Sequence, residues 1–496
     1  MASTSYKWHG HLTRDEEAPV PTPIGAWEEK EEDNIDENVY RGDWADLPEL
    51  ILEKIYSTLN MSQRYAASQV CRNWYYAFHL PASWHTFVFD DHTLTRRKYN
   101  YYSGWTHMLD HLRTQMCLST VGKHFKALIF APETNFYNLY EFMSMISYYA
   151  ETKHHALLSG LGSKVHTLRY TFPCSQATRD EDARLYGTGG KLLEALKRLM
   201  NSLPSLRRLE LVDLMLDSFE AIHLLDDVCF NQCTTMTHLT IINATKYICP
   251  LLHLTTFVNL KVLVVSPQNI GDDVIKALAD SNLAHLHIVQ NRYTPVDVVA
   301  VAKSAWKRCK FRVHLGVSTR REKTLLIQEG ARVSSVIYAS PQIKLQADTI
   351  SRVIELYKDT LRVYGHTCLP RYHQAKSFHD RMDSWLLLMC RQSPNLETLM
   401  IRERISTATC LLIAHARPTL KHLYIRRNAV ILRCDWGYNP EWSSEFYAWL
   451  KSCAQSYDEV EKEIAAMLGQ SHWTMLSDKE YRNIKQTFVQ FGQSDQ

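Results

Sequence analysis

The segment Leu206-Arg-Arg-Leu209-Glu-Leu211 carries the pattern on which the fold depends. Its last two leucines are two residues apart, so on a β-strand both point to the same face. Similar L-x-x-L-x-L segments, with other apolar residues at some leucine positions, recur along the chain. They span residues 165–170, 236–241, 260–265, 283–288, 396–401 and 420–425. The sequence therefore predicts a series of short strands that share one buried face.

The spacing of these segments indicates a repeat. Weaker copies centre on Val313, Val336 and Leu361, and from Leu239 onward the central positions follow at intervals of 24, 23, 27, 23, 25, 38 and 24 residues. Most intervals lie in or near the ~20–29-residue period of leucine-rich repeats. The long interval predicts an insertion within residues 369–378. Helices are expected between strands, for example at 271–279 and 295–306.

The predicted fold class is α/β. An irregular leucine-rich-repeat solenoid, or horseshoe, would place a parallel sheet on one side and helices on the other, with the leucine pairs packed between them. A doubly wound α/β domain is the alternative, because its strands also alternate with helices. Its strand–helix–strand unit usually takes roughly 30 residues or more. The shorter interval therefore favours the solenoid.

The composition excludes a mainly disordered chain, because 45% of the 496 residues are hydrophobic. Lys and Arg number 56 and Asp and Glu number 53, a balance that argues against a nucleic-acid coat or a polybasic membrane binder. No apolar stretch approaches the ~18 residues that span a bilayer, and the N-terminus lacks the apolar core of a signal peptide. We therefore expect a cytoplasmic or nuclear protein whose 12 cysteines are reduced.

Two different segments precede the repeats. Residues 1–42 hold ten acidic and four basic residues, and their low aliphatic content predicts a disordered acidic tail. In residues 43–85, Ile51, Ile55 and Leu59 are four residues apart and line one face of a helix, which Pro48 can begin. Three short helices are expected here. A core this small would gain stability from a partner that covers its apolar face.

Residues 43–85 resemble an F-box. The resemblance rests on Leu47-Pro48 at the start of the first helix, on Val-Cys-Arg-Asn-Trp at 70–74 and on Trp84. The chain departs from the family pattern at three positions: Met61, Arg64 and Ser83. With the repeats that follow, the chain most resembles the F-box only protein 33 and 39 group.

The F-box resemblance implies docking on the Skp adaptor of a cullin–RING ubiquitin ligase. The residues that it implies for adaptor binding are Leu47, Pro48, Ile51, Leu52, Ile55, Leu59, Val70, Cys71 and Trp74.

The remaining chain divides into three expected parts. Residues 86–160 are predicted to be a helical linker and N-terminal cap, with an amphipathic helix at 104–116 and an aromatic, Met-rich helix at 139–149. Residues 161–435 are predicted to form the leucine-rich-repeat-like, substrate-binding domain. Residues 436–496 are predicted to be a helical cap over the open end of the array, with helices at 441–468 and 477–488.

Residues that flank the leucine pairs point to the concave face of the predicted sheet. Near its C-terminal end these include Met400, Arg402, Tyr424 and Arg426, which are residue types favoured at binding hot spots. They are the predicted substrate-binding residues. His285 and His287 share a strand face and are predicted recognition residues; a metal site formed with His238 is the less favoured alternative. We find no convincing catalytic or metal-binding pattern and expect no cofactor.

The predicted function is that of a non-catalytic substrate-recognition subunit of an SCF (Skp–cullin–F-box) ubiquitin ligase. The expected partners are the Skp adaptor, the cullin and an unknown protein substrate. A non-degradative scaffold that binds the adaptor without a cullin is the main alternative. An RNA-binding solenoid is a third, since residues beyond the acidic tail carry excess positive charge; against it, the basic residues form no stripe in the sequence.

Overall fold

The computed structural model describes residues 44–101, 104–132, 135–152, 160–172, 190–319 and 324–491. Contacts divide the chain into a unit of Met1–Leu47 and a unit of Pro48–Gln496. In the first unit only residues 44–47 are described, and they hold the 3-10 turn η1 (Trp44–Asp46). The predicted acidic tail, 1–42, lies outside the described residues.

The second unit begins with the three short helices that the sequence predicts. They are α1 (Glu49–Thr58), α2 (Met61–Ser68) and α3 (Arg72–Phe78), followed by the 3-10 turn η2 (Pro81–Trp84). The buried Tyr56 links the first and third helices, because its hydroxyl donates to the carbonyl oxygen of Trp74 at 2.8 Å. Asn60 and Gln63 form a reciprocal capping box that starts α2.

A large parallel sheet follows, and its strands pair in chain order. The described strands are β1 (Thr86–Phe89), β4 (Ala127–Phe130), β5 (Thr167–Thr171), β6 (Arg208–Val212), β7 (His238–Ile242), β8 (Val262–Val265), β9 (His285–Asn291), β10 (Arg312–Ser318), β11 (Val333–Tyr338), β12 (Val363–His366), β13 (Thr398–Ile401) and β15 (His422–Ile425). Each of the L-x-x-L-x-L segments overlaps one of them. The α/β class is therefore confirmed, and the strand order shows no reversal of the kind found in doubly wound sheets.

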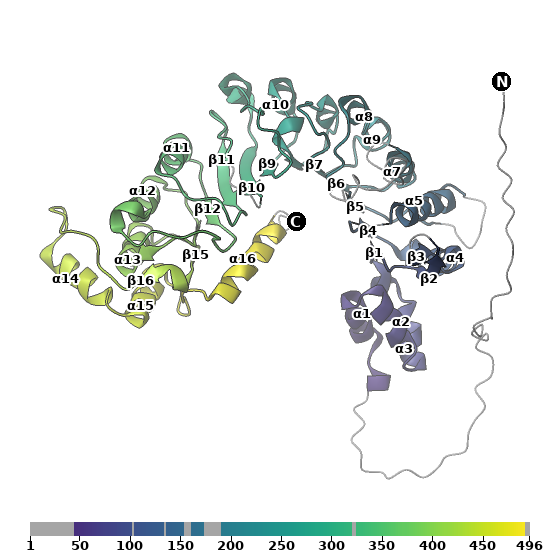
Figure 1. Cartoon of the computed structure of the whole chain (residues 1–496), viewed down its shortest axis with the longest axis horizontal. Helices are drawn as coiled ribbons and strands as arrows, with labels where there is room; N and C mark the ends of the chain where they lie inside the picture. Colours follow the sequence, from purple (N-terminus) through teal and green to yellow (C-terminus); the bar gives the residue numbers. More distant parts are fainter. Residues whose placement is uncertain are drawn as a thin grey trace, which may run out of the picture. The chain divides into compact units, whose positions relative to one another are not determined.

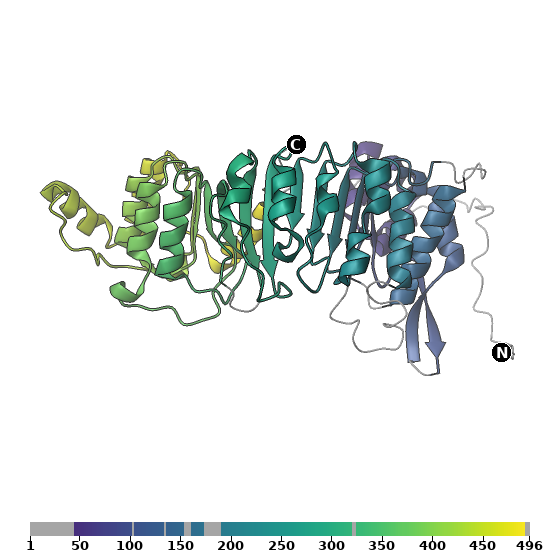
Figure 2. The same cartoon turned by 90° about the horizontal axis from the view of Figure 1, so that it is seen from above.

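Helices cover one face of this sheet (Figures 1 and 2). They are α4 (His111–Thr120), α5 (Phe136–Glu151), α7 (Lys191–Asn201), α8 (Ser218–Ile222), α9 (Asp226–Gln232), α10 (Asp272–Leu278), α11 (Ala347–Tyr357), α12 (Asp383–Gln392) and α13 (Thr407–Ala416). The paired leucines, such as Leu209 and Leu211, are fully buried in one core that the strands and helices share. Burial of these aliphatic side chains is the main source of stability for the layered arrangement.

Two predicted helices are wrong. Residues 104–116 form strand β3 (Gly104–Leu109), which pairs with β2 (Thr95–Asn100) in a hairpin, and then α4. The side chain of Asp110 accepts hydrogen bonds from the first turn of α4, so the helix begins there. Residues 295–306 contain no α-helix, only the 3-10 turn η6 (Lys303–Arg308), and Val296 and Val299 in this stretch stay exposed.

The expected helical linker at 86–160 also needs correction, because β1 and β4 already belong to the sheet. The regular array thus begins directly after the N-terminal helices. The helices predicted at 139–149 and 271–279 are present as α5 and α10.

The C-terminal region contains three helices rather than two. Residues 441–468 divide into α14 (Ser444–Cys453) and α15 (Tyr457–Leu468), and both contact α13. The last helix, α16 (Asp478–Phe491), does not join them at the end of the array. It crosses to the face of the sheet that the other helices leave free, beside β11, β12 and β15 (Figure 1). The expectation that it caps the open end is therefore wrong.

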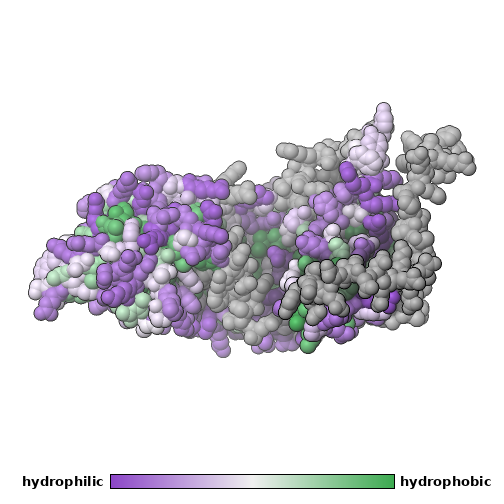
Figure 3. Space-filling model, turned by 90° about the horizontal axis from the view of Figure 1, so that it is seen from below, coloured by the Kyte–Doolittle hydropathy of each residue, from purple (hydrophilic) through white to green (hydrophobic). Residues whose placement is uncertain are grey.

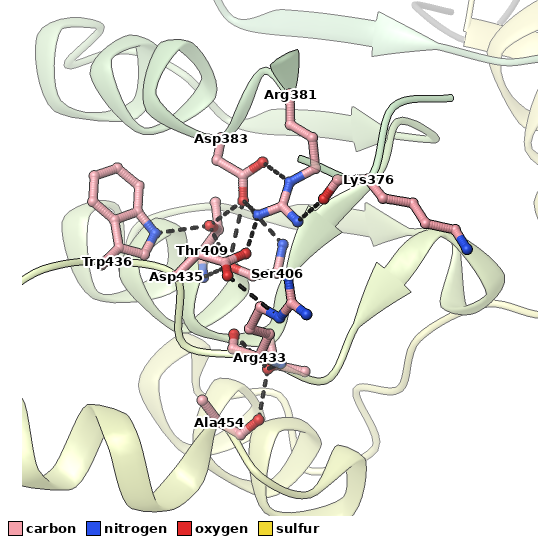
Figure 4. A network of polar contacts seen from close by, with 10 residues as sticks. Lys376, Arg381, Asp383, Ser406, Thr409, Arg433, Asp435, Trp436 and Ala454 are labelled. Carbon is pink, nitrogen blue, oxygen red and sulfur yellow. Dashed lines mark hydrogen bonds and ion pairs between the residues drawn. The ribbon is translucent and has the colours of Figure 1, made fainter. Parts of the chain in front are cut away.

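A buried ionic network joins the loops of the C-terminal half (Figure 4). Asp383 is fully buried and pairs with Arg381 at 2.9 Å. The same carboxylate accepts hydrogen bonds from Ser406 and Thr409, and Arg381 also bonds to Asp435. The network ties the predicted insertion, which is present between β12 and α12, to the strand and helix that follow.

Candidate functional site

The N-terminal helices present apolar side chains to solvent. Leu50 is 79% exposed, Ile51 48% and Val70 68%. Tyr65, Tyr75 and Tyr76 are exposed on the same small module. A surface of this kind is typical of a protein–protein interface. We call the exposed side chains of Leu50, Ile51 and Val70 the apolar surface of the module.

The predicted adaptor-binding residues fall into three groups. Pro48, Ile51 and Val70 are exposed, whereas Leu47, Ile55, Leu59, Cys71 and Trp74 are half-buried. Leu52 is fully buried, so it stabilises the module from inside and is not available to a partner. Leu50 was missed, because the family pattern that identified the module leaves this position open.

Arg64, one of the departures from the family pattern, is a structural residue. Its side chain is buried, and its Nε donates to the carbonyl oxygens of Tyr56 and Leu59, each at 2.9 Å. These carbonyls lie at the C-terminal end of α1, where helical backbone acceptors lack partners. The guanidinium also lies 5.3 Å from the ring centroid of Trp84. Arg64 therefore joins the first helix to the turn η2 that precedes the sheet.

Three of the four predicted substrate-binding residues near the C-terminal end, Met400, Tyr424 and Arg426, are covered fully or in part by α16. Met400 is buried in a cluster with Tyr481 and Ile484 of α16, and Tyr424 packs against this cluster. Arg426 pairs with Asp478, the first residue of α16, through two bonds of 2.7 and 3.1 Å. The hydrogen bonds from Arg426 lower the pKa of the Asp478 carboxyl. The expectation that these side chains are exposed is therefore wrong, because a helix of the same chain covers them.

Arg402 is fully buried for a different reason. Its guanidinium donates to the carbonyl oxygens of Ser340 (2.8 Å) and Cys368 (3.0 Å), and also to that of Ile343. It pairs with Glu403 at 3.1 Å. Arg402 therefore holds together the loops that follow β11, β12 and β13, a role that its sequence position beside Met400 does not reveal.

The histidines of β9 lie together with a third that the sequence reasoning missed. His285 lies 3.0 Å from His314 of β10 between ring nitrogens, and His287 stacks on His314 with centroids 4.2 Å apart. Burial, followed by the neighbouring His285, lowers the pKa of His287 to about 4. The rings are half-buried on the face without covering helices, and His238 lies two strands away. Among the described residues no group of three His, Cys, Asp or Glu is arranged to hold a metal ion.

The side of the protein seen in Figure 3 is largely hydrophilic, with small apolar patches, outside the atoms drawn in grey. The face of the sheet away from the covering helices stays uncovered by α16 over the N-terminal strands, where Arg169 of β5 pairs with Glu210 of β6 at 3.3 Å. In the part of the chain that the structure describes, no helix has the length and apolar character needed to cross a membrane.

Comparison with known proteins identifies the N-terminal module. Residues 44–99 match the F-box-like family. None of the curated proteins matches the chain. Among solved structures, the chain is similar to a chain in the crystal structure of the yeast Rad7 and Elc1 complex. The two chains are 13% identical, the match covers 80% of this chain and 91% of that chain, and the TM-score is 0.32. The module is therefore F-box-like, while membership of the F-box only protein 33 and 39 group stays a prediction.

Proposed function

We propose that the chain is a substrate-recognition subunit of an SCF-type ubiquitin ligase. The observation that carries the proposal is the apolar surface on an F-box-like module, formed by Leu50, Ile51 and Val70. Burying each of these side chains against an adaptor would contribute about 1.5–3 kcal/mol. In this proposal the chain docks through these helices on the Skp adaptor, and the adaptor connects it to the cullin.

The parallel sheet would hold the target protein. We propose that it is an irregular leucine-rich-repeat array, which its sequential strand order, its buried leucine pairs and the period of the sequence support. The chain would be non-catalytic and would act by proximity, raising the effective concentration of the target near the charged ubiquitin carrier. A cytoplasmic or nuclear location fits this role.

The test is affinity purification of the full chain from cells beside an Ile51→Glu/Val70→Glu variant. Both side chains are exposed, so the substitutions leave the module core intact, but a carboxylate buried in an adaptor interface is costly. Phe230→Glu is the matched control, because Phe230 is 87% exposed on α9, outside the module. Wild type and control are expected to recover the adaptor and a cullin, and the double variant neither.

Two outcomes would change the proposal. Recovery of the adaptor without any cullin would favour the non-degradative scaffold. Equal recovery of the adaptor by all three chains would refute docking through this surface.

A further inference from the structure

Basic residues far apart in the sequence meet along one edge of the sheet. They occupy the positions just before β1, β4, β5, β6 and β8, strands that follow one another in the sheet together with β7. Backbone hydrogen bonds of 2.8–2.9 Å connect these positions in the order His85, Lys126, His166, Arg207, Thr237 and Lys261. Lys123 and Lys164 lie in the turns that lead into the same row. We call Lys123, Lys126, Lys164, Arg207 and Lys261 the basic row.

The turns of the basic row contribute no acidic side chain, although Glu53 of α1 lies beside His85 at the end of the row. The turns at 81–85, 121–126, 160–166, 202–207, 233–237 and 257–261 contain no Asp or Glu. None of the five side chains forms an ion pair with another described residue, and Lys123, Lys164, Arg207 and Lys261 are exposed. Burial lowers the pKa of the neighbouring His166, and Lys126 and Arg207 lower it further, as expected at a site of positive potential.

The C-terminal half of the same edge is built differently. Arg362, Glu397 and Lys421 occupy the equivalent positions before β12, β13 and β15, and Glu397 pairs with both cations, at 3.3 and 3.0 Å. Arg308 pairs with Asp280 at 2.7 Å. Much of the positive charge on the C-terminal half of this edge is thus balanced within the chain, with Arg332 before β11 exposed and outside the described ion pairs, whereas the basic row has no such partners. A general need for surface charge would not produce this difference.

We propose that the basic row binds an acidic, Asp- or Glu-rich segment of a protein partner. Six adjacent strand positions at about 4.8 Å span about 24 Å, a length along which an extended peptide presents roughly four side chains from one face. Single-stranded nucleic acid is less well matched, because its binding sites usually offer aromatic rings for base stacking. The aromatic residues of these turns, Trp84, Phe125 and Phe257, are buried.

The test measures binding of two labelled peptides to the full chain by fluorescence anisotropy. One peptide alternates Glu with Ser over twelve residues, and the other has Gln in place of Glu. The variant Lys126→Gln/Arg207→Gln/Lys261→Gln is compared with Arg308→Gln/Arg362→Gln/Lys421→Gln, which changes the net charge equally on the same edge. Each exposed ion pair is expected to raise the affinity roughly twofold. The first variant, which removes three such pairs, should therefore weaken binding of the Glu peptide about tenfold, and the second variant less than twofold. Added salt should weaken binding of the Glu peptide to the wild type.

Three results would overturn the inference: equal binding of the two peptides, an equal loss in the two variants, or tighter binding of a twelve-nucleotide oligouridylate than of the Glu peptide. The last would assign the row to nucleic acid. The inference does not depend on ubiquitin ligase function, and adaptor binding measured on the same variants separates the two, since neither variant alters the apolar surface of the module.

Discussion

Replacing Tyr481 by Ala should release α16 from the sheet. Tyr481 is fully buried, packs with Met400 and Ile484, and donates its hydroxyl hydrogen to the carbonyl oxygen of His366 at 2.8 Å. Truncation of a buried aromatic side chain to Ala typically costs about 3–5 kcal/mol. Tyr481→Phe, the matched control, removes only the hydrogen bond and should cost about 1 kcal/mol.

The loss should be local, because α16 contributes one helix to the free face while the main core lies on the other side of the sheet. The ion pair between Arg426 and Asp478 adds only about 0.5–1 kcal/mol, so it cannot keep the helix docked alone. Backbone amides of α16 would then exchange with solvent through local opening.

Hydrogen exchange measured by mass spectrometry tests this prediction. In Tyr481→Ala, peptides covering α16 should lose protection, whereas those covering β6–β8 should keep it, and Tyr481→Phe should give a small effect. Unchanged protection of α16 in Tyr481→Ala would show that the helix is held by something other than this contact. Uniform loss across the chain would show that it is part of the global core.

The remaining predictions concern stability. Arg64→Ala should destabilise the N-terminal module by about 2–3 kcal/mol, because two carbonyl groups at the end of α1 lose a charged donor. Faster hydrogen exchange of the α1 backbone amides would reveal this loss, and unchanged exchange of these amides would contradict the prediction. Asp383→Ala should lower the free energy of unfolding, measured with urea, by about 3–5 kcal/mol, because Arg381 would lose a buried partner. A loss below about 1 kcal/mol would contradict this role of the ion pair. Burial lowers the pKa of His287 to about 4 in the folded protein, whereas in the unfolded chain its pKa is 6.5. Between these two pH values the unfolded chain therefore binds a proton at His287 and the folded protein does not. Its contribution to stability is therefore complete above pH 6.5 and falls by at most about 2 kcal/mol on going to pH 5. His287→Gln should flatten the stability decline between pH 7.5 and pH 5, and an unchanged slope would contradict this assignment.

The strands could be predicted because their signal is local. Pairs such as Leu209 and Leu211 repeat at a steady interval, and each short segment carries its own evidence for a buried face. The hairpin of β2 and β3 was missed because Gly104–Leu109 mixes apolar and polar residues in a pattern that also fits a helix. Boundaries between such segments depend on pairing with a distant strand, which composition does not show.

The candidate sites were harder to predict because they depend on long-range contacts. The sequence correctly points Met400 toward the face without covering helices, but it cannot show that Tyr481 returns to cover it. Arg64 illustrates the same limit, since its partners at the end of α1 become visible only in the folded module. The basic row needs the strand register, which brings Lys126 and Lys261 to one edge.

The central claim is that the N-terminal helices bind a Skp adaptor through their exposed apolar side chains. The most direct test is a calorimetric titration of purified adaptor into the full chain, the Leu50→Glu/Ile51→Glu variant and the Phe230→Glu control. The double variant is expected to raise the Kd at least about tenfold, and the control is expected to match the wild type within about twofold. An unchanged Kd in the double variant, or no binding by the wild type, would contradict the claim.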